Sequence, residues 1–138
     1  MSQQPMVSEP DQAALSAFRG TLRGSLVVPD DAEYDATRGI WNGMIDRRPG
    51  YIVRCQGVAD VIAAVNFART HGLLVAVRGG GHGVAGHAVC NGGMMIDLSN
   101  MRAVRVDAAA RRAWVQGGAT WGDVDWVIMN MENHRWLT

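Results

Sequence analysis

The feature that most constrains this chain is a glycine-rich stretch that directly follows a short apolar run. Residues 75–77 are Val-Ala-Val, Arg78 comes next, and five of the eight residues 79–86 are glycine. A short β-branched run between breaker residues is typical of a buried strand. Glycines allow positive φ and close approach to a ligand, and their N–H groups can form an anion-binding nest. Arg78 adds a charge suited to phosphate. The stretch therefore predicts a loop that wraps a phosphate-bearing ligand, with His82 held against it.

The glycines allow two other interpretations. Residues 81–86 match the dinucleotide-binding pattern G-x-G-x-x-G. That motif also requires a helix that begins on the glycines and an acidic residue about 20 positions later. Residues 87–93 have the composition of a loop, and Asp97 comes too early, so this interpretation is disfavoured. A plain connecting loop without a ligand is the other alternative, and the density of glycines makes it less favoured.

Three motifs occur in a defined order: RGGGHG at residues 78–83, NGGMMIDLS at 91–99 and GGATWGDV at 117–124. Together they resemble the flavin domain of FAD-linked oxidases, the berberine-bridge-enzyme-like proteins with a PCMH-type (vanillyl-alcohol-oxidase-type) FAD-binding domain. The resemblance runs from about Arg48 to Trp126. It implies FAD as the cofactor.

The resemblance also implies which residues contact the cofactor. In this family the glycine loop cradles the FAD pyrophosphate, and the loop histidine is the usual covalent attachment point for the flavin; His82 matches that position. The second glycine motif lies near the FAD in the family, although from sequence alone a plain strand-to-helix connection remains an alternative. The predicted cofactor contacts are Arg78, Gly79, Gly80, Gly81, His82, Gly83, Val84, Gly86, His87, Gly117, Gly118, Ala119 and Thr120.

Apolar spacing predicts a β-α-β unit that positions the glycine loop. Residues 51–54 and 74–77 are predicted strands. Residues 58–68 carry apolar side chains at the i, i+3, i+4, i+7 spacing of a helix, and Gly72 stands where a C-cap belongs. The two strands should be parallel with a right-handed crossover. The loop would then leave the carboxyl end of a strand, where open α/β sheets bind ligands.

The second half of the chain predicts further strands and a helix. Residues 94–98 form an apolar strand pattern, and the alternation in residues 104–107 and 112–116 predicts a hairpin. Thr120 is a favourable N-cap residue, and Asp123 at the third position after it resembles a capping box. A helix is therefore expected to begin at the residue after Thr120.

The predicted fold is α+β, the N-terminal lobe of a PCMH-type FAD-binding domain. Residues 1–47 are expected to be a helical lead-in, beginning with a helix capped by Asp11, and residues 48–126 part of the FAD-binding domain. Residues 127–138 show no clear period and are expected to be a divergent tail. We expect a fragment of a longer oxidoreductase that lacks the family's substrate domain, with self-association through exposed apolar surface.

Composition argues against several other classes of function. The formal net charge is zero, which disfavours nucleic acid or an anionic membrane as a partner. No apolar run approaches the ~20 residues that span a bilayer, and the N-terminus does not resemble a signal peptide, so a cytoplasmic location is expected. His82, His87 and Cys90 are possible zinc ligands, but a fourth would have to be distant, so no metal is expected.

The resemblance implies a flavin-dependent oxidoreductase. The flavin would accept a hydride from an alcohol, a sugar or a related donor and pass electrons to oxygen. Neither Cys55 nor Cys90 matches the cysteine that forms a second flavin link in some members, and neither Tyr34 nor Tyr51 matches a family catalytic base. A non-catalytic nucleotide- or phosphate-binding module and an inactive relic remain the alternatives.

Overall fold

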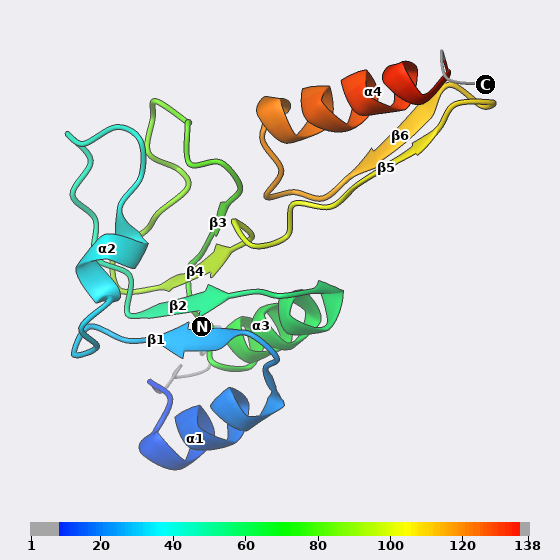
Figure 1. The fold of residues 1–138 in the computed structure, drawn as a ribbon. Coiled ribbons are helices and arrows are strands. Elements are labelled where there is room, and N and C mark those ends of the chain that lie inside the picture. The colour runs from blue at the N-terminus through cyan, green and yellow to red at the C-terminus, as the bar shows by residue number, and fades with distance from the viewer. Residues whose placement is uncertain (1–8, 136–138) are drawn as a thin grey trace, which may run out of the picture.

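The structure, a computed structural model, describes the backbone of residues 9–135 and the side chains up to residue 131. Within these residues an open four-stranded sheet is followed by a separate two-stranded hairpin and a helix (Figure 1). No helix in this part of the chain has the length and apolar character needed to cross a membrane. The elements are α1 (Gln12–Thr21), β1 (Ser25–Val27), α2 (Tyr34–Arg38), β2 (Tyr51–Arg54), α3 (Val58–Thr70), β3 (Val75–Arg78), β4 (Met94–Asp97), β5 (Val104–Asp107), β6 (Arg112–Val115) and α4 (Trp121–Arg135).

The strand order of the sheet is β1-β2-β4-β3. The predicted parallel arrangement of β2 and β3 is confirmed, but they are not neighbours, because β4 lies between them and is parallel to both. Strand β1 was not predicted; it pairs antiparallel with β2 at the outer edge. Its three residues are too few to show a period-2 pattern, so only its neighbour reveals it.

Two apolar cores cover the two faces of the sheet. One core joins Phe18 of α1 and Ala64 of α3 to the strand residues Val53 and Ile96, and the rings of Phe18 and Phe67 stack with centroids 4.1 Å apart. The other core joins Tyr34 of α2 to strand and loop residues, which are Val27, Ile52, Val89 and Met95. Strand β4 is buried along its whole length, as expected for a parallel strand covered on both faces.

Side-chain hydrogen bonds and a left-handed glycine fix the ends of the helices beside the sheet. The Asp11 carboxylate accepts the Ala14 N–H at 2.7 Å, which confirms the predicted cap of α1. Gly72 has φ +57° just after the last residues of α3, as the predicted C-cap requires. The buried Asp60 carboxylate accepts backbone N–H groups of Arg23 and Gly24, at 2.8 and 3.0 Å, and so joins the start of α3 to the chain before β1.

The hairpin β5–β6 and helix α4 extend away from the four-stranded sheet (Figure 1). Both the hairpin and the start of α4 were predicted, and α4 contacts β5. This region exposes large apolar side chains, among them Trp114, Trp121 and Trp126. Residue 126 falls inside α4, so the division of the chain at that position stays a prediction. The α+β class is confirmed.

Candidate functional site

The glycine loop, residues 79–93, leaves the carboxyl end of β3 and leads directly into β4. No helix begins on these glycines, so the geometry that G-x-G-x-x-G requires is missing from this loop. Gly81, Gly86 and Gly92 have φ values of +72°, +73° and +67°. Since other L residues rarely adopt this region, the turns of the loop depend on glycine at these three positions.

The glycine loop and the second glycine motif meet backbone against backbone. A Cβ atom built on Gly79 would lie 2.4 Å from the carbonyl oxygen of Gly117. A Cβ atom on Gly118 would lie 1.7 Å from the carbonyl oxygen of Leu98. Side chains at these two positions would force the segments apart. The structure therefore brings together two motifs that are distant in sequence, as the resemblance implied.

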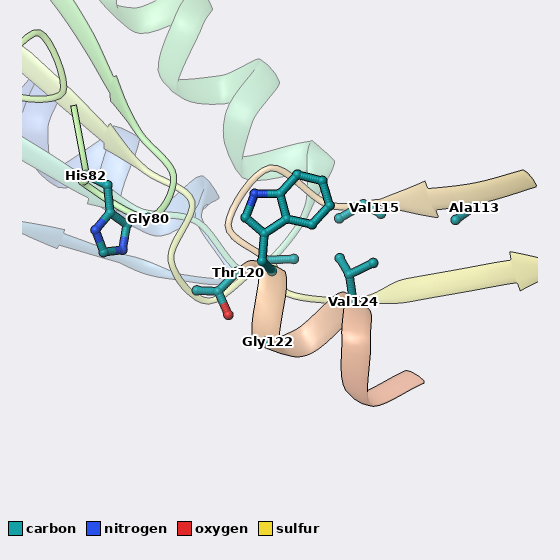
Figure 2. Close-up of a pocket in the computed structure, with 9 residues that line it drawn as sticks. Gly80, His82, Ala113, Val115, Thr120, Gly122 and Val124 are labelled. Carbon is teal, nitrogen blue, oxygen red and sulfur yellow. The ribbon is translucent and has the colours of Figure 1, made fainter. Parts of the chain in front are cut away.

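An apolar pocket of about 840 Å³ lies between the glycine loop and the hairpin with α4 (Figure 2). His82 and Gly80 stand on one side of it. Small or apolar residues form the opposite side: Ala113, Val115, Ala119, Trp121, Gly122 and Val124. The volume of the pocket falls in the range of small-molecule sites, and His82 is the ionisable side chain in its lining.

A smaller pocket of about 200 Å³ lies on the other side of Gly80 and Thr120, which line both pockets. Its lining is rich in glycine, from Gly39, Gly79–Gly81 and Gly118. The other lining residues are the polar Arg78, Ser99, Arg102 and Thr120 and the apolar Ile40 and Trp41. Backbone N–H groups of such a loop bind anions well. A polar, glycine-lined pocket thus adjoins a larger apolar one.

The His82 side chain is exposed and lies against the backbone of its own loop. A Cβ atom on Gly80 would lie 2.9 Å from Cδ2 of the imidazole, so glycine at position 80 makes room for the ring. The Trp41 ring faces the same imidazole, with centroids 6.2 Å apart and an interplanar angle of 44°. These contacts place the imidazole between the loop backbone and the apolar pocket.

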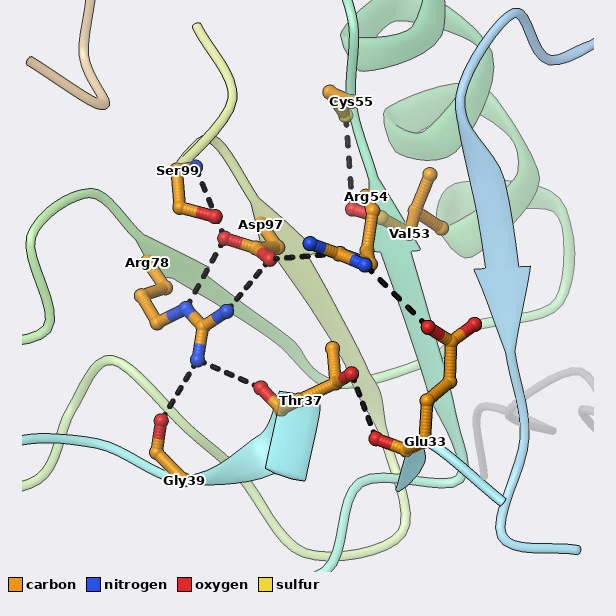
Figure 3. Close-up of polar contacts among 9 residues, drawn as sticks. All are labelled: Glu33, Thr37, Gly39, Val53, Arg54, Cys55, Arg78, Asp97 and Ser99. Atoms are coloured by element: carbon orange, nitrogen blue, oxygen red, sulfur yellow. Dashed lines mark hydrogen bonds and ion pairs between the residues drawn. The ribbon is translucent and has the colours of Figure 1, made fainter. Parts of the chain in front are cut away.

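Arg78 has a structural role in addition to the predicted one. Its guanidinium donates from Nε and Nη2 to the two carboxylate oxygens of Asp97, at 3.1 and 2.6 Å (Figure 3). Its Nη1 donates to the carbonyl oxygens of Thr37 and Gly39, both at 2.7 Å. The guanidinium is thus paired and held within the protein, and Arg78 also lines the smaller, glycine-rich pocket, so its contact with a phosphate stays a prediction. Register explains the pair, because Arg78 and Asp97 are partners at the ends of β3 and β4.

Asp97 is completely buried in a row of three charged residues at the carboxyl edge of the sheet. Arg78 lies on one side of it, and Nε of Arg54 lies 3.7 Å from its Oδ2 on the other side. The Ser99 N–H donates to Oδ1 at 3.0 Å. Burial alone would raise the pKa of Asp97, but the hydrogen bonds from Arg78 and Ser99 lower it below its ordinary value.

Arg102 is a residue of the polar pocket that the motifs did not reveal. Its guanidinium forms a two-point ion pair with Asp123, at 2.9 and 2.5 Å. Asp123 also accepts the backbone N–H of Thr120 at 2.7 Å, which confirms the predicted cap of α4. The ion pair and the cap hold the pKa of Asp123 far below its usual range. The only signal for Arg102 in the sequence was a basic residue shortly after the NGGMMIDLS motif of residues 91–99.

Four predicted contacts lie further along the glycine loop. Gly83, Val84 and His87 are exposed, and Gly86 is buried against the Ile45 side chain. None of the four lines the apolar or the polar pocket. Their contact with a cofactor therefore stays a prediction, whereas the remaining predicted residues line one of the pockets or, for Gly117, meet Gly79 directly.

The cysteines do not resemble reactive groups. Cys55 and Cys90 are both free and buried. Burial raises the pKa of Cys55 to about 11 and also raises that of Cys90, so both thiols stay protonated near neutral pH. Among the residues that the structure describes, no group of three or more His, Cys, Asp and Glu side chains is arranged to hold a metal ion.

Comparison with known proteins agrees with the motifs. A family model described as an FAD binding domain matches residues 49–133. The chain is 38% identical to (R)-6-hydroxynicotine oxidase of Paenarthrobacter nicotinovorans over 104 residues, which are 75% of this chain and 23% of that protein. It is 32% identical to berberine bridge enzyme-like 14 of Arabidopsis thaliana over 90 residues, or 64% of this chain and 17% of that protein.

The fold agrees as well. The crystal structure of 6-hydroxy-D-nicotine oxidase from Arthrobacter nicotinovorans superposes with a TM-score of 0.71 at 39% identity, covering 74% of this chain and 22% of that one. The chain thus spans about a quarter or less of the length of the relatives that it matches.

Proposed function

Because the chain belongs to the FAD binding domain family, we propose that it holds FAD across the two adjoining pockets and serves a flavin-dependent oxidation. The pyrophosphate lies in the polar pocket and the flavin ring in the apolar one. The observation that carries this assignment is the shared border of the pockets at Gly80 and Thr120, which sets a compact anion site beside a wide apolar site.

The polar pocket fits a diphosphate because backbone of Gly79, Gly80 and Gly81 lines it, whereas the Gly118 N–H already donates to the Met101 carbonyl at 3.0 Å. Gly79 and Gly118 are packed so closely that a Cβ atom on either would occupy space that the neighbouring backbone now fills. N–H groups of the loop can converge on phosphate oxygens without side chains between them. Arg78 and Arg102 both line this pocket, and each is already paired with a carboxylate, so the backbone of the glycine loop carries the assignment.

The apolar pocket fits the flavin ring because its walls carry few polar groups and His82 faces it (Figure 2). In the proposed complex Val115 and Val124 contact the ring, and the exclusion of water there favours binding of a planar aromatic group. His82 is the candidate for a covalent link to the flavin. Histidine is suited to this task because its neutral imidazole is a nucleophile at neutral pH.

The proposed reaction is the transfer of a hydride from an organic donor to the flavin, followed by transfer of electrons to oxygen. The bound flavin supplies the redox chemistry. The residues of this chain bind the cofactor, orient it and shield one side of the ring. The relative named (R)-6-hydroxynicotine oxidase supports an oxidase reaction. Alcohol, sugar and amine-type donors are the proposed classes.

Ligand titration tests the assignment and separates the two pockets. The chain has five tryptophans, so quenching of their fluorescence can be followed with FAD, riboflavin and inorganic pyrophosphate as separate probes. We expect FAD to bind at least about tenfold more tightly than riboflavin or pyrophosphate, because FAD would occupy both pockets and each smaller probe only one. Binding of pyrophosphate as tight as that of FAD, with no effect of riboflavin, would instead indicate a phosphate-binding module.

Gly79→Ala is expected to weaken FAD binding at least about tenfold, because a cost of ~1.4 kcal/mol already gives that factor. The added methyl group must displace the carbonyl of Gly117, which lies 2.4 Å from the Cβ position. Gly83→Ala is the matched control, since nothing lies within 4 Å of its Cβ position. The same titration measures both variants, and equal affinities for the two would contradict the packing argument.

A further inference from the structure

A segment before β2 runs along the glycine loop and bonds to it repeatedly. We call residues 41–48 the strap; it contains no helix or strand. The Trp41 N–H donates to the Gly81 carbonyl at 3.1 Å, and the Asn42 amide Nδ2 donates to the Val84 carbonyl at 3.0 Å. These two bonds lie on either side of His82. The strap therefore fixes the loop immediately before and after the histidine.

Arg47 holds the next part of the loop. Its Nη1 donates to the carbonyl oxygens of Gly86 and Val89, at 2.8 and 3.2 Å. The Ile45 side chain packs beside Gly86, where a Cβ atom would lie 2.8 Å from its Cγ2. Side chains of the strap thus satisfy carbonyl groups of a loop that has no regular partner of its own. The contacts between the strap and the glycine loop follow the chain in the same direction: Trp41 bonds to Gly81, Asn42 to Val84, and Arg47 to Gly86 and Val89.

We propose that Asn42 and Arg47 are positioning residues that hold His82 beside the flavin ring. The inference rests on the proposed function, since the ring is what the imidazole must face. A loop with five glycines in eight residues loses much conformational entropy when it is ordered. Bonds from a segment outside the loop keep it in one conformation before the cofactor binds, and so raise the fraction of molecules in which His82 is correctly placed.

The strap and the polar pocket can be separated experimentally. Asn42 and Arg47 bond to the loop after Gly81, whereas the polar pocket uses Gly79–Gly81 and Gly118. Trp41 is the strap residue that lines the polar pocket, whereas Asn42 and Arg47 do not line it. Loss of the Asn42 or Arg47 side chain should therefore free the histidine part of the loop and leave most of the anion site in place. We expect Arg47→Ala to slow covalent attachment of FAD about tenfold while it changes the FAD dissociation constant less than about threefold.

Arg48→Ala is the matched control. Arg48 is also part of the strap, but it bonds to the Asn91 side chain and to Gly92 through its backbone N–H and C=O. Its guanidinium lies 3.7 Å from Asp35 and does not contact the loop. Removal of this side chain should leave the loop as it is. Arg47→Lys should restore part of the attachment rate, because an ammonium group can donate to the same carbonyls.

Amide hydrogen exchange of the chain without FAD provides a readout that does not depend on the cofactor. We expect Arg47→Ala and Asn42→Ala to raise exchange in residues 82–90 while exchange in β2 and β4 is unchanged; Arg48→Ala should resemble the parent. Equal exchange in Arg47→Ala, Asn42→Ala and Arg48→Ala would overturn the inference. If FAD fails to bind the parent, the proposed function fails, yet the exchange experiment still decides whether the strap orders the loop. If Arg47→Ala does not fold, Asn42→Ala and Arg47→Lys carry the test.

Discussion

His82→Ala is expected to release all flavin into the supernatant when the FAD-loaded protein is precipitated with acid, whereas the parent chain keeps yellow colour in the pellet. The reason is that His82, which lines the apolar pocket, is the proposed nucleophile. The link would join an imidazole nitrogen of His82 to a flavin carbon in place of an N–H and a C–H bond, and the two electrons and two protons released would pass to dissolved oxygen, giving hydrogen peroxide. Alanine removes the nitrogen and leaves the loop backbone unchanged.

His87→Ala is the control for this experiment. His87 is exposed on the same loop but lines neither pocket, so its loss should leave the colour in the pellet. Absorbance of pellet and supernatant near 450 nm, together with the mass of the intact protein, gives the bound fraction. Colour retained by His82→Ala, or lost by His87→Ala, would contradict the assignment. Reversible FAD binding by His82→Ala should persist, since the polar pocket is intact.

Asp97→Asn is expected to destabilise the fold by about 3–5 kcal/mol, the usual cost of leaving a buried charge without its partner. The side chain of Asp97 is fully buried and that of Arg78 is 12% exposed. An amide cannot neutralise the guanidinium, and it replaces one acceptor oxygen by a donor group. Urea unfolding followed by circular dichroism measures the change. The melting temperature should fall by about 10 °C or more.

The effect should also depend on pH. Because the pKa of Asp97 is lower in the folded chain than in the unfolded chain, its stabilisation is complete above the unfolded value of about 3.9 and is lost as the pH falls through the folded value. The difference between parent and Asp97→Asn should therefore be constant from pH 7 to 5 and shrink below about pH 4. Asp35→Asn is the control, because Asp35 is 72% exposed and pairs with Arg38 at the surface. Equal losses of stability in the two variants would exclude the buried-pair argument.

Local patterns predicted most elements of the fold, because periodicity and caps act over a few residues. The helix in residues 58–70, the hairpin and the Thr120 cap all follow from spacing alone. The insertion of β4 between β2 and β3 does not follow from spacing, because strand order depends on contacts between distant segments. The glycine motifs indicated where the two pockets lie because, as with periodicity and caps, the backbone freedom of glycine is a local property of each motif.

The parts of the site that the sequence did not reveal depend on pairing across the fold. An isolated arginine after a strand is suited to phosphate, and only the register with β4 reveals that Arg78 is also paired with the Asp97 carboxylate. The strap has no period or motif, because its side chains bond to backbone carbonyls whose position no pattern encodes. Arg102 is assigned to the site only because the structure shows that it lines the polar pocket.

The position of β4 has a consequence for how the chain folds. The glycine loop is the covalent connection that carries β4 from β3 into the gap beside β2. Until this central strand arrives, β2 and β3 have no hydrogen-bonded contact with each other, so closing the loop and completing the sheet are one event. Such non-local parallel pairing is a slow step in folding. FAD present during refolding should therefore act on the rate of sheet assembly itself, as a template around which the last strand is inserted.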